Sequence, residues 1–565
     1  MKTINAKHSE MAMHPLGTQT FADIIEKLGT DAGLGNVRQR DLISGLRRVA
    51  KALGREPNEV IADPKWLQPR LSKVAPAALG LTVKSWQNAI SDARAALARV
   101  EIVKYRNRHI DYLQPAWRVL WRAVLASGDR TLIPGLGRFI HFLSNLDVAP
   151  DAVTQTHADA FLVAVKADEI AKRPEVSWRN AVCAWNLATT RLKDWPQIHL
   201  VVPKRQNVIR LPDEALPPSF LCDLAGFMQR SAHPDPFAED EPVRALAAST
   251  IKQRTAMLKR FASELLRTGV PEEEIGSVAA LCAPGLAKRG LQAMVVRKDN
   301  RTSAVIDDMA TILLSCAHRL GLDENMRAGL ADLARRVTIP PQRGLTSKNR
   351  ERLRVLRDDA TLRRLLELPD RLCAMRRGLK PKAAALARED ALAIAILLVC
   401  PLRIGNIAGI QIEHNLQRPG DGRVFLNFSE DEIKNHRPME FEVPPDVRRM
   451  LDRHLTNRSP LLCPPGTPWL FPRRDGTDHV DGNSLSTRLA QRIRKETGII
   501  MNAHLFRHLA AMLWLDANPG GYEAARRLLG HSSVSQTINV YSGLETHSVF
   551  EAFGNVLKTK KVGKK

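Results

Sequence analysis

The sequence is poor in several features that mark other classes of protein. Aromatic residues make up only 5% of its 565 positions, which gives little sign of a platform for stacking single-stranded bases. Its seven cysteines are scattered and contain no Cys-x-x-Cys pair, so neither a disulfide framework nor a zinc site is predicted. We expect reduced thiols in a cytoplasmic protein.

Motifs for membranes, nucleotides and metals are also missing. The longest apolar run, residues 391–400, is too short to cross a bilayer, and the N-terminus lacks the charged-then-apolar pattern of a signal peptide. There is no G-x-x-x-x-G-K-[ST] phosphate loop and no convincing carboxylate cluster for a two-metal nuclease. We therefore expect a soluble protein that uses no cofactor and no metal.

Positive charge is what the chain has in excess. Its 84 Lys and Arg residues against 60 Asp and Glu give a net charge of +24 and a pI near 10.1. Such an excess favours a polyanionic partner, although a ribosome-associated or simply basic protein would show it too. With so few aromatic residues, a protein that follows the backbone of duplex DNA is the better interpretation.

The length and the apolar spacing indicate several domains. A chain of 565 residues is too long for one core. Apolar residues recur at helical spacing in three blocks, from residue 21 to about 100, from about 115 to 192 and from about 218 to 333, with proline-bearing linkers after the second and third. The predicted domains are 1–110, 111–210, 211–340 and 341–565.

The three helical blocks share a faint internal repeat. Each contains a Leu, then an Arg two positions on, an apolar residue, a second Leu and a proline turn. The three copies are Leu46/Arg48/Val49/Leu53, Leu136/Arg138/Phe139/Leu143 and Leu258/Arg260/Phe261/Leu265. Such a pattern is common in helical proteins, so coincidence and duplication both remain open.

The last domain is expected to be mainly α with a small antiparallel sheet. The run RVFLNF is β-like, and EIKNHRPMEFEVP predicts two extended arms about the turn at residues 435–438. The basic segment TSKNRERLRVLRD is either a solvated linker or a tether along the phosphate backbone. The C-terminal residues predict a short amphipathic helix that ends in lysines.

Residues suited to chemistry on a phosphate gather near the C-terminus. Tyr541 follows the motif LLGH, which ends at His531, and a phenol needs activating neighbours to act as a nucleophile. Arginines in CPLRIGN and HLFRH, Arg403 and Arg507, have the planar fork that holds two phosphate oxygens.

Two histidines in HLFRH are spaced like a zinc pair. His504 and His508 are one helical turn apart, but position 505 is Leu where a zinc protease needs its Glu base. The zinc interpretation therefore fails, and an imidazole suited to proton transfer near neutral pH remains.

Six of these residues stand in the order found in one family. With Lys434 before the NHRP turn, the set resembles the active site of the tyrosine recombinases, or phage-integrase family. One departure is Asn406, where the family often has Glu. The six residues are Arg403, Lys434, His504, Arg507, His531 and Tyr541.

The resemblance implies a role for each residue. Tyr541 would attack a backbone phosphate and form a 3′-phosphotyrosyl bond, with the two arginines on the phosphate oxygens. His504 would act in proton transfer and Lys434 would protonate the leaving 5′ oxygen. His531 would contact the phosphate or pack near the nucleophile, and His508 would be a buried structural residue.

The resemblance also implies partners. The third block is similar to the helical core-binding domain of the family, so double-stranded DNA with specific recombination sites is the expected partner. A homotetramer on two duplexes, accessory or companion recombinases, a mobile element and a bacterial nucleoid location are further expectations. The candidate DNA-contacting residues are Lys252, Arg254, Arg260, Lys348 and Arg350.

Three alternatives remain open at this level. A type IB topoisomerase uses the same residue types but rejoins the same strand, and a protelomerase makes hairpin ends. A non-catalytic DNA-binding or accessory protein would have a decayed site, although here all six residues are present.

Overall fold

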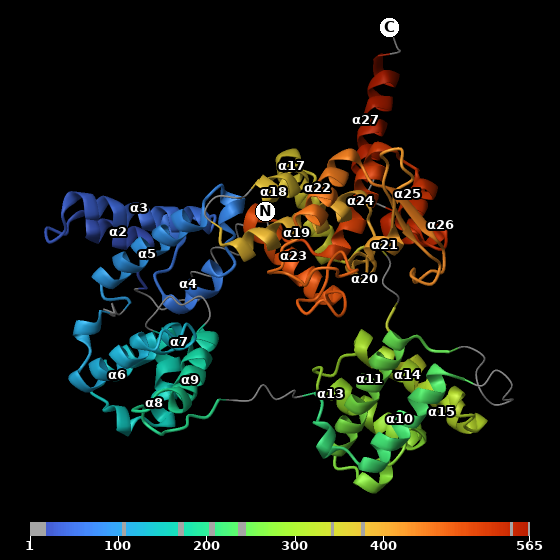
Figure 1. Cartoon of the computed structure of the whole chain (residues 1–565), viewed down its shortest axis with the longest axis horizontal. Helices are drawn as coiled ribbons and strands as arrows, with labels where there is room; N and C mark the ends of the chain where they lie inside the picture. Colours follow the sequence, from blue (N-terminus) through green and yellow to red (C-terminus); the bar gives the residue numbers. More distant parts are fainter. Residues whose placement is uncertain are drawn as a thin grey trace. The chain divides into compact units, whose positions relative to one another are not determined.

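The computed structural model describes residues 18–103, 109–167, 174–202, 209–234, 245–340, 344–374, 379–542 and 546–562. Within these ranges the protein is mainly helical, with one small three-stranded antiparallel sheet (Figure 1), as predicted. The chain divides into two compact units, one formed by residues 1–202 and 343–565 and the other by residues 203–342. No described helix is long and apolar enough to cross a membrane.

The first helical block has its own apolar core, which includes Phe21, Leu46 and Leu97. The long helices α3 and α5 pack closely against each other. The elements of this block are α2 (Phe21–Gly29), α3 (Asn36–Ala52), η1 (Pro57–Glu59), α4 (Pro64–Leu71), η2 (Pro76–Leu79) and α5 (Val83–Arg99).

The second block is built in the same way around a core rich in aromatic residues. Trp117, Phe139 and Trp185 are fully buried there, and α7 packs against α9. Its elements are η3 (Ile110–Tyr112), α6 (Pro115–Ala126), α7 (Leu132–Asn145), η4 (Pro150–Ala152), α8 (Gln155–Ala167) and α9 (Pro174–Arg191).

The third block is the separate unit formed by residues 203–342. Its core includes Phe220, Phe261 and Leu313. Its elements are η5 (Asp213–Ala215), α10 (Pro218–Ala232), α11 (Ala248–Arg267), η6 (Glu272–Ile275), α12 (Val278–Leu281), α13 (Pro284–Val296), α14 (Ala304–Arg319) and α15 (Glu324–Val337). The predicted domain boundaries remain predictions, but each helical block thus has a core of its own.

The C-terminal part surrounds α19, whose residues 391–397 are all buried. The apolar run of the sequence is therefore a core helix. Four helices lead up to and include it, namely α16 (Ser347–Val355), α17 (Asp359–Leu366), α18 (Leu368–Ala374) and α19 (Pro381–Val399). Next come α20 (Ile404–Ala408), α21 (Ile412–Asn415) and the strands β1 (Leu416–Gln417), β2 (Phe425–Phe428) and β3 (Met439–Glu442). The remainder is α22 (Pro445–Thr456), α23 (Gly482–Thr497), α24 (Ala503–Ala517), α25 (Tyr522–Leu529), α26 (Val534–Tyr541) and α27 (Thr546–Val562).

A buried ionic cluster joins α19 to α23. The carboxylates of Glu389 and Asp390 are almost inaccessible to solvent, and Arg488 pairs with both, at 2.5 and 2.8 Å. Arg492 contacts Asp390 at 2.9 Å. Burial raises the pKa of both carboxyl groups, and the arginines oppose that shift. The cluster fixes the position of α23 on the central helix.

The predicted shape of the hairpin was partly wrong. The sheet has the order β1-β2-β3, and Phe428 pairs with Met439. The strand that pairs with β3 is therefore β2. The residues EIKNHRP, which were predicted as an extended arm and a turn, form the connection between the two strands. His436 in this connection has a φ of 48°, a left-handed conformation that turns the chain back.

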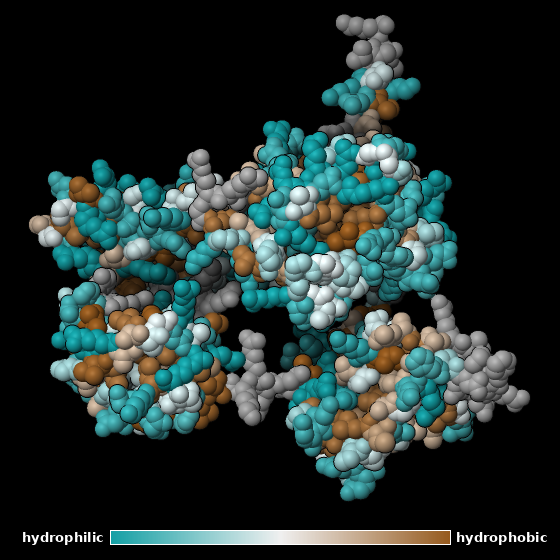
Figure 2. Space-filling model, viewed as in Figure 1, coloured by the Kyte–Doolittle hydropathy of each residue, from teal (hydrophilic) through white to brown (hydrophobic). Residues whose placement is uncertain are grey.

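The C-terminal helix is present as expected. α27 carries exposed apolar side chains, among them Phe550, Phe553 and Val556. Figure 2 shows hydrophobic and hydrophilic residues side by side on this helix.

Candidate active site

The predicted catalytic residues come from five segments of the C-terminal part. Arg403 is the N-cap of α20 and Lys434 lies in the connection between β2 and β3. His504 and Arg507 are on α24, His531 follows α25, and Tyr541 ends α26.

Tyr541 is enclosed by two histidines. Its side chain is 1% exposed, and its hydroxyl oxygen lies 2.9 Å from Nδ1 of His508 in a hydrogen bond. The ring of His531 is stacked on the phenol, with ring centroids 6.1 Å apart and an angle of 5° between the planes. The candidate nucleophile is therefore held away from solvent in this structure.

The charge state of this pair follows from its burial. Burial raises the pKa of Tyr541 to about 12, although the positive charge of Arg507 acts against the shift. Burial, with the nearby charges of His504 and Arg507, lowers the pKa of His508 to about 4. Both groups are neutral at pH 7, so an imidazole with its proton on Nε2 accepts a hydrogen bond from the hydroxyl.

Arg507 is fixed by two backbone carbonyl groups. Its Nη1 and Nη2 atoms each donate a hydrogen bond of 2.6 Å, to the Pro401 oxygen and to the Leu529 oxygen. The residue is 3% exposed, and burial and the charge of Arg403 lower its pKa to about 10. Two of its five N–H groups are used in this way, and the guanidinium ties the CPLR segment to the end of α25.

Asn435 connects three parts of the site. Its side-chain Nδ2 donates to the backbone oxygen of Gly530 at 2.7 Å, and its Oδ1 accepts a hydrogen bond of 3.5 Å from Nη2 of Arg403. Asn406 supports the same connection by donating to the Glu432 backbone oxygen at 2.7 Å. From the sequence, Asn435 is predicted only as a turn residue, and its place between two arginine motifs is the available signal for a role in the site.

Two further predicted residues lie at the solvent side of the site. His504 is exposed, its ring centroid is 4.7 Å from that of His508, and its pKa is lowered by partial burial and by the charges of Arg507 and Arg403. Lys434 is exposed, and no hydrogen bond or ion pair joins it to another residue in the described part of the chain. The site thus brings the arginines, histidines and tyrosine together but leaves Lys434 at its edge.

His531 is positioned by a contact with Thr537 on α26. Its Nδ1 lies 2.9 Å from Oγ1 of Thr537, and the side chain is 7% exposed. Burial lowers the pKa of His531 to about 4, and the positive charges of nearby arginines, of which Arg507 has the largest effect, add to this shift. A neutral ring in this position can stack on the phenol at neutral pH without adding charge.

The basic segment before the site is a helix, so its interpretation as a linker was wrong, while contact of its cations with a phosphate backbone stays a prediction. Thr346 caps α16 through its side chain, and Leu353 is buried in the core. Lys348 and Arg350 are exposed on this helix. Just before it, the backbone N–H of Gly344 donates to the Asn539 oxygen on α26 at 2.9 Å.

The remaining candidate DNA contacts are on α11 of the separate unit. Lys252 is exposed, whereas Arg254 and Arg260 are partly buried. Burial lowers the pKa of Arg260, and its Nε has no hydrogen-bond partner among the described residues. Of these three cations, Lys252 is therefore the most accessible to solvent.

One family model matches the part of the chain that holds the candidate site. Residues 370–547 match the model of the phage integrase family, and this range holds all six predicted catalytic residues. This part of the chain is thus similar to the phage integrase family.

Solved recombinase structures are similar over a little more than half of the chain. A XerA recombinase has 16% identity and a TM-score of 0.27, covering 59% of this chain and 98% of that one. A XerH recombinase bound to a palindromic difH substrate has 14% identity and a TM-score of 0.35, covering 61% and 98%. The integrase of mycobacterium phage Brujita has 17% identity and a TM-score of 0.23, covering 53% and 86%. No curated protein matches the chain.

Proposed function

We propose that this protein cuts and rejoins duplex DNA at specific sites through a 3′-phosphotyrosyl intermediate. The observation that carries the proposal is the position of Tyr541 beside His508, His531 and the charge of Arg507. A phenol placed among fixed cations and neutral imidazoles suits attack on a phosphate that gains negative charge as it becomes five-coordinate.

The reaction conserves the energy of the phosphodiester. The Tyr541 oxygen forms a bond to phosphorus, and the bond from phosphorus to the 5′ oxygen breaks. His504 takes the phenol proton, since it is the exposed imidazole of the site and its lowered pKa keeps it neutral. Lys434 gives a proton to the 5′ oxygen. The 5′ hydroxyl of a partner strand then attacks the adduct and releases the tyrosine, so neither a metal nor ATP is required.

Tyr541 must leave its enclosed position before it can attack. Its hydroxyl is buried against His508, and α26 is the element that carries it. Gly344 binds the same helix through Asn539. We infer that the structure represents a resting state and that a change at α26 precedes cleavage.

The working unit in this proposal is a homotetramer on two duplexes that serves a mobile element in a bacterium. The exposed apolar residues of α27 support assembly because such a patch is costly to leave in water. Accessory or companion recombinases would join at the same DNA.

The test uses DNA fragments from the sequence that flanks the gene. We expect the full chain to form a covalent, protease-sensitive adduct on the 3′ side of a cut, trapped by SDS, and the Tyr541→Phe variant to bind but form none. An equal adduct with the variant contradicts the assignment of Tyr541. Relaxation of a supercoiled plasmid that lacks any such site would indicate a topoisomerase instead.

A further inference from the structure

The first two helical blocks share a close helix crossing at the same point of their internal repeat. A Cβ atom at Gly45 on α3 would lie 3.2 Å from the Ala89 backbone oxygen on α5. A Cβ atom at Gly135 on α7 would lie 3.0 Å from the Asn180 oxygen on α9. In both blocks a glycine therefore lets two long helices approach at the same place, one residue before the first Leu of the repeat.

The elements around this crossing also correspond. Leu46 and Leu136 are both fully buried, and each of the two helices is followed by a 3₁₀ turn that begins with proline, Pro57 or Pro150. A further helix comes next, and then the long partner helix, with the short turn η2 between them in the first block only. The sequence repeat and the packing thus correspond between the two blocks, which favours duplication of one module.

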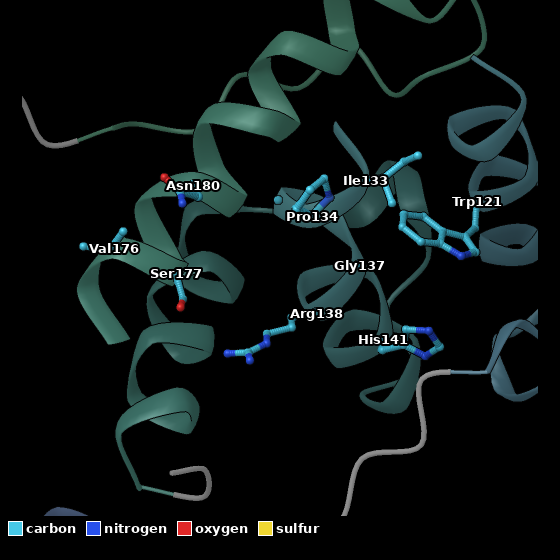
Figure 3. A pocket seen from close by; sticks show the side chains of 10 residues that line it. Trp121, Ile133, Pro134, Gly137, Arg138, His141, Val176, Ser177 and Asn180 are labelled. Carbon is cyan, nitrogen blue, oxygen red and sulfur yellow. The ribbon is translucent and has the colours of Figure 1, made fainter. Parts of the chain in front are cut away.

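The two copies have a hollow on the same face of the corresponding helix. The hollow on α3 has a volume of about 570 Å³ and that on α7 about 750 Å³, and Figure 3 shows the second. The lining residues on α3 include Ile43, Ser44, Arg47, Arg48 and Lys51, and those at the corresponding places on α7 are Ile133, Pro134, Gly137, Arg138 and His141.

The charge of the two hollows has diverged. In the second copy, Gly137 and His141 stand where the first has Arg47 and Lys51, and Trp121 forms part of the wall. The first copy keeps the cations, which lie on one stripe of the helix. All are exposed and none makes an ion pair with a described residue. They are Arg40, Arg47, Arg48 and Lys51.

We propose that the α3 hollow binds the phosphate backbone of duplex DNA. The only carboxylate of α3, Asp41, is not among the lining residues, and Ile43 is the only apolar one. A helix of 17 residues is about 25 Å long, so its cations reach successive phosphates along a strand. Figure 2 shows a mainly hydrophilic surface over α2, α3 and α5. A hollow with four cations and a single, partly buried apolar residue suits a sugar-phosphate backbone better than a folded protein.

The matched variants differ only in where the charge is removed. Arg47→Gln/Lys51→Gln removes two cations of the hollow, and Lys65→Gln/Lys84→Gln removes two exposed cations of the same module outside it. Both pairs are made in the full chain with Tyr541→Phe. Binding is then measured without cleavage, and its outcome does not depend on the proposed chemistry.

Binding to a long duplex of random sequence is measured by fluorescence anisotropy over a range of salt concentrations. We expect the hollow variant to lose about 1.8 from the slope of log affinity against log salt, since each phosphate contact contributes about 0.9. The control should keep the slope of the parent, and thermal melting should show that both variants are folded. Equal slopes for all three proteins would overturn the proposal, as would an equal loss in the control.

Discussion

The hydroxyl of Tyr541 and Nδ1 of His508 form a buried hydrogen bond of 2.9 Å. This contact joins the end of α26 to the middle of α24, two helices that both carry predicted catalytic residues. The prediction that His508 is buried is confirmed, whereas its hydrogen-bond partner was not predicted.

Replacement of His508 by Ala should leave the Tyr541 hydroxyl buried without its acceptor. The expected loss in free energy of unfolding is about 1–3 kcal/mol. A double-mutant cycle with Tyr541→Phe, measured by urea denaturation, should give a coupling of about 1 kcal/mol. Additive effects of the two substitutions would show that the bond does not form in solution.

Asn435→Ala should slow cleavage while DNA binding stays the same. The amide connects Arg403 to the Gly530 carbonyl, so its loss frees the arginine and the connection between β2 and β3. A displacement of this kind costs on the order of 10²-fold in rate. Arg437→Ala, an exposed change in the same connection, is the control in a single-turnover assay. The assignment of Asn435 as a positioning residue fails if both variants cleave at the parent rate.

Three buried histidines should make stability depend on pH. The pKa values of His454, His508 and His531 are lowered to about 4, mainly by burial, against about 6.5 when unfolded. The unfolded chain therefore binds more protons as the pH falls from 7 towards 4. Each histidine stabilises the fold above pH 6.5 and loses that contribution, up to about 3 kcal/mol, on acidification.

His454→Gln isolates one of these contributions. The raised pKa values of Glu389 and Asp390 act in the opposite direction, so the informative quantity is the difference between parent and variant. Denaturation at pH 7 and pH 5 should show a smaller loss of stability in the variant. Equal losses would mean that the His454 ring is not held neutral in the folded protein.

Arg488→Met should destabilise the C-terminal part strongly. The substitution leaves Glu389 without its ion-pair partner and Asp390 with one arginine fewer, and breaking a buried pair costs about 3–5 kcal/mol. Lys495→Met, on the exposed side of the same helix, should cost less than about 1 kcal/mol. Thermal or urea unfolding distinguishes the two, and similar losses would contradict the role given to the cluster.

Local sequence was sufficient for the helices and for the choice of candidate site residues, whose catalytic roles stay predictions. The apolar spacing of the three blocks, the helices at residues 359–366 and 381–399 and the small sheet follow from periodicity and turn residues. The connection between β2 and β3 was harder to predict, because a run of mixed residues fits a strand and a loop equally well. The same ambiguity made the helix α16, which has few apolar residues, look like a linker.

The sequence by itself determined the charge of the protein and the order of Arg403, Lys434, His504, Arg507, His531 and Tyr541, and these sufficed to indicate a recombinase. Only the tertiary structure decided which atoms of those residues meet. Arg507 reaches the carbonyls of Pro401 and Leu529, and Asn435 reaches Gly530, across stretches of chain that no local pattern relates. The close helix crossing at Gly45 and at Gly135 also depends on the tertiary structure. The missing side chain of a glycine permits a close approach only where a second helix packs against it.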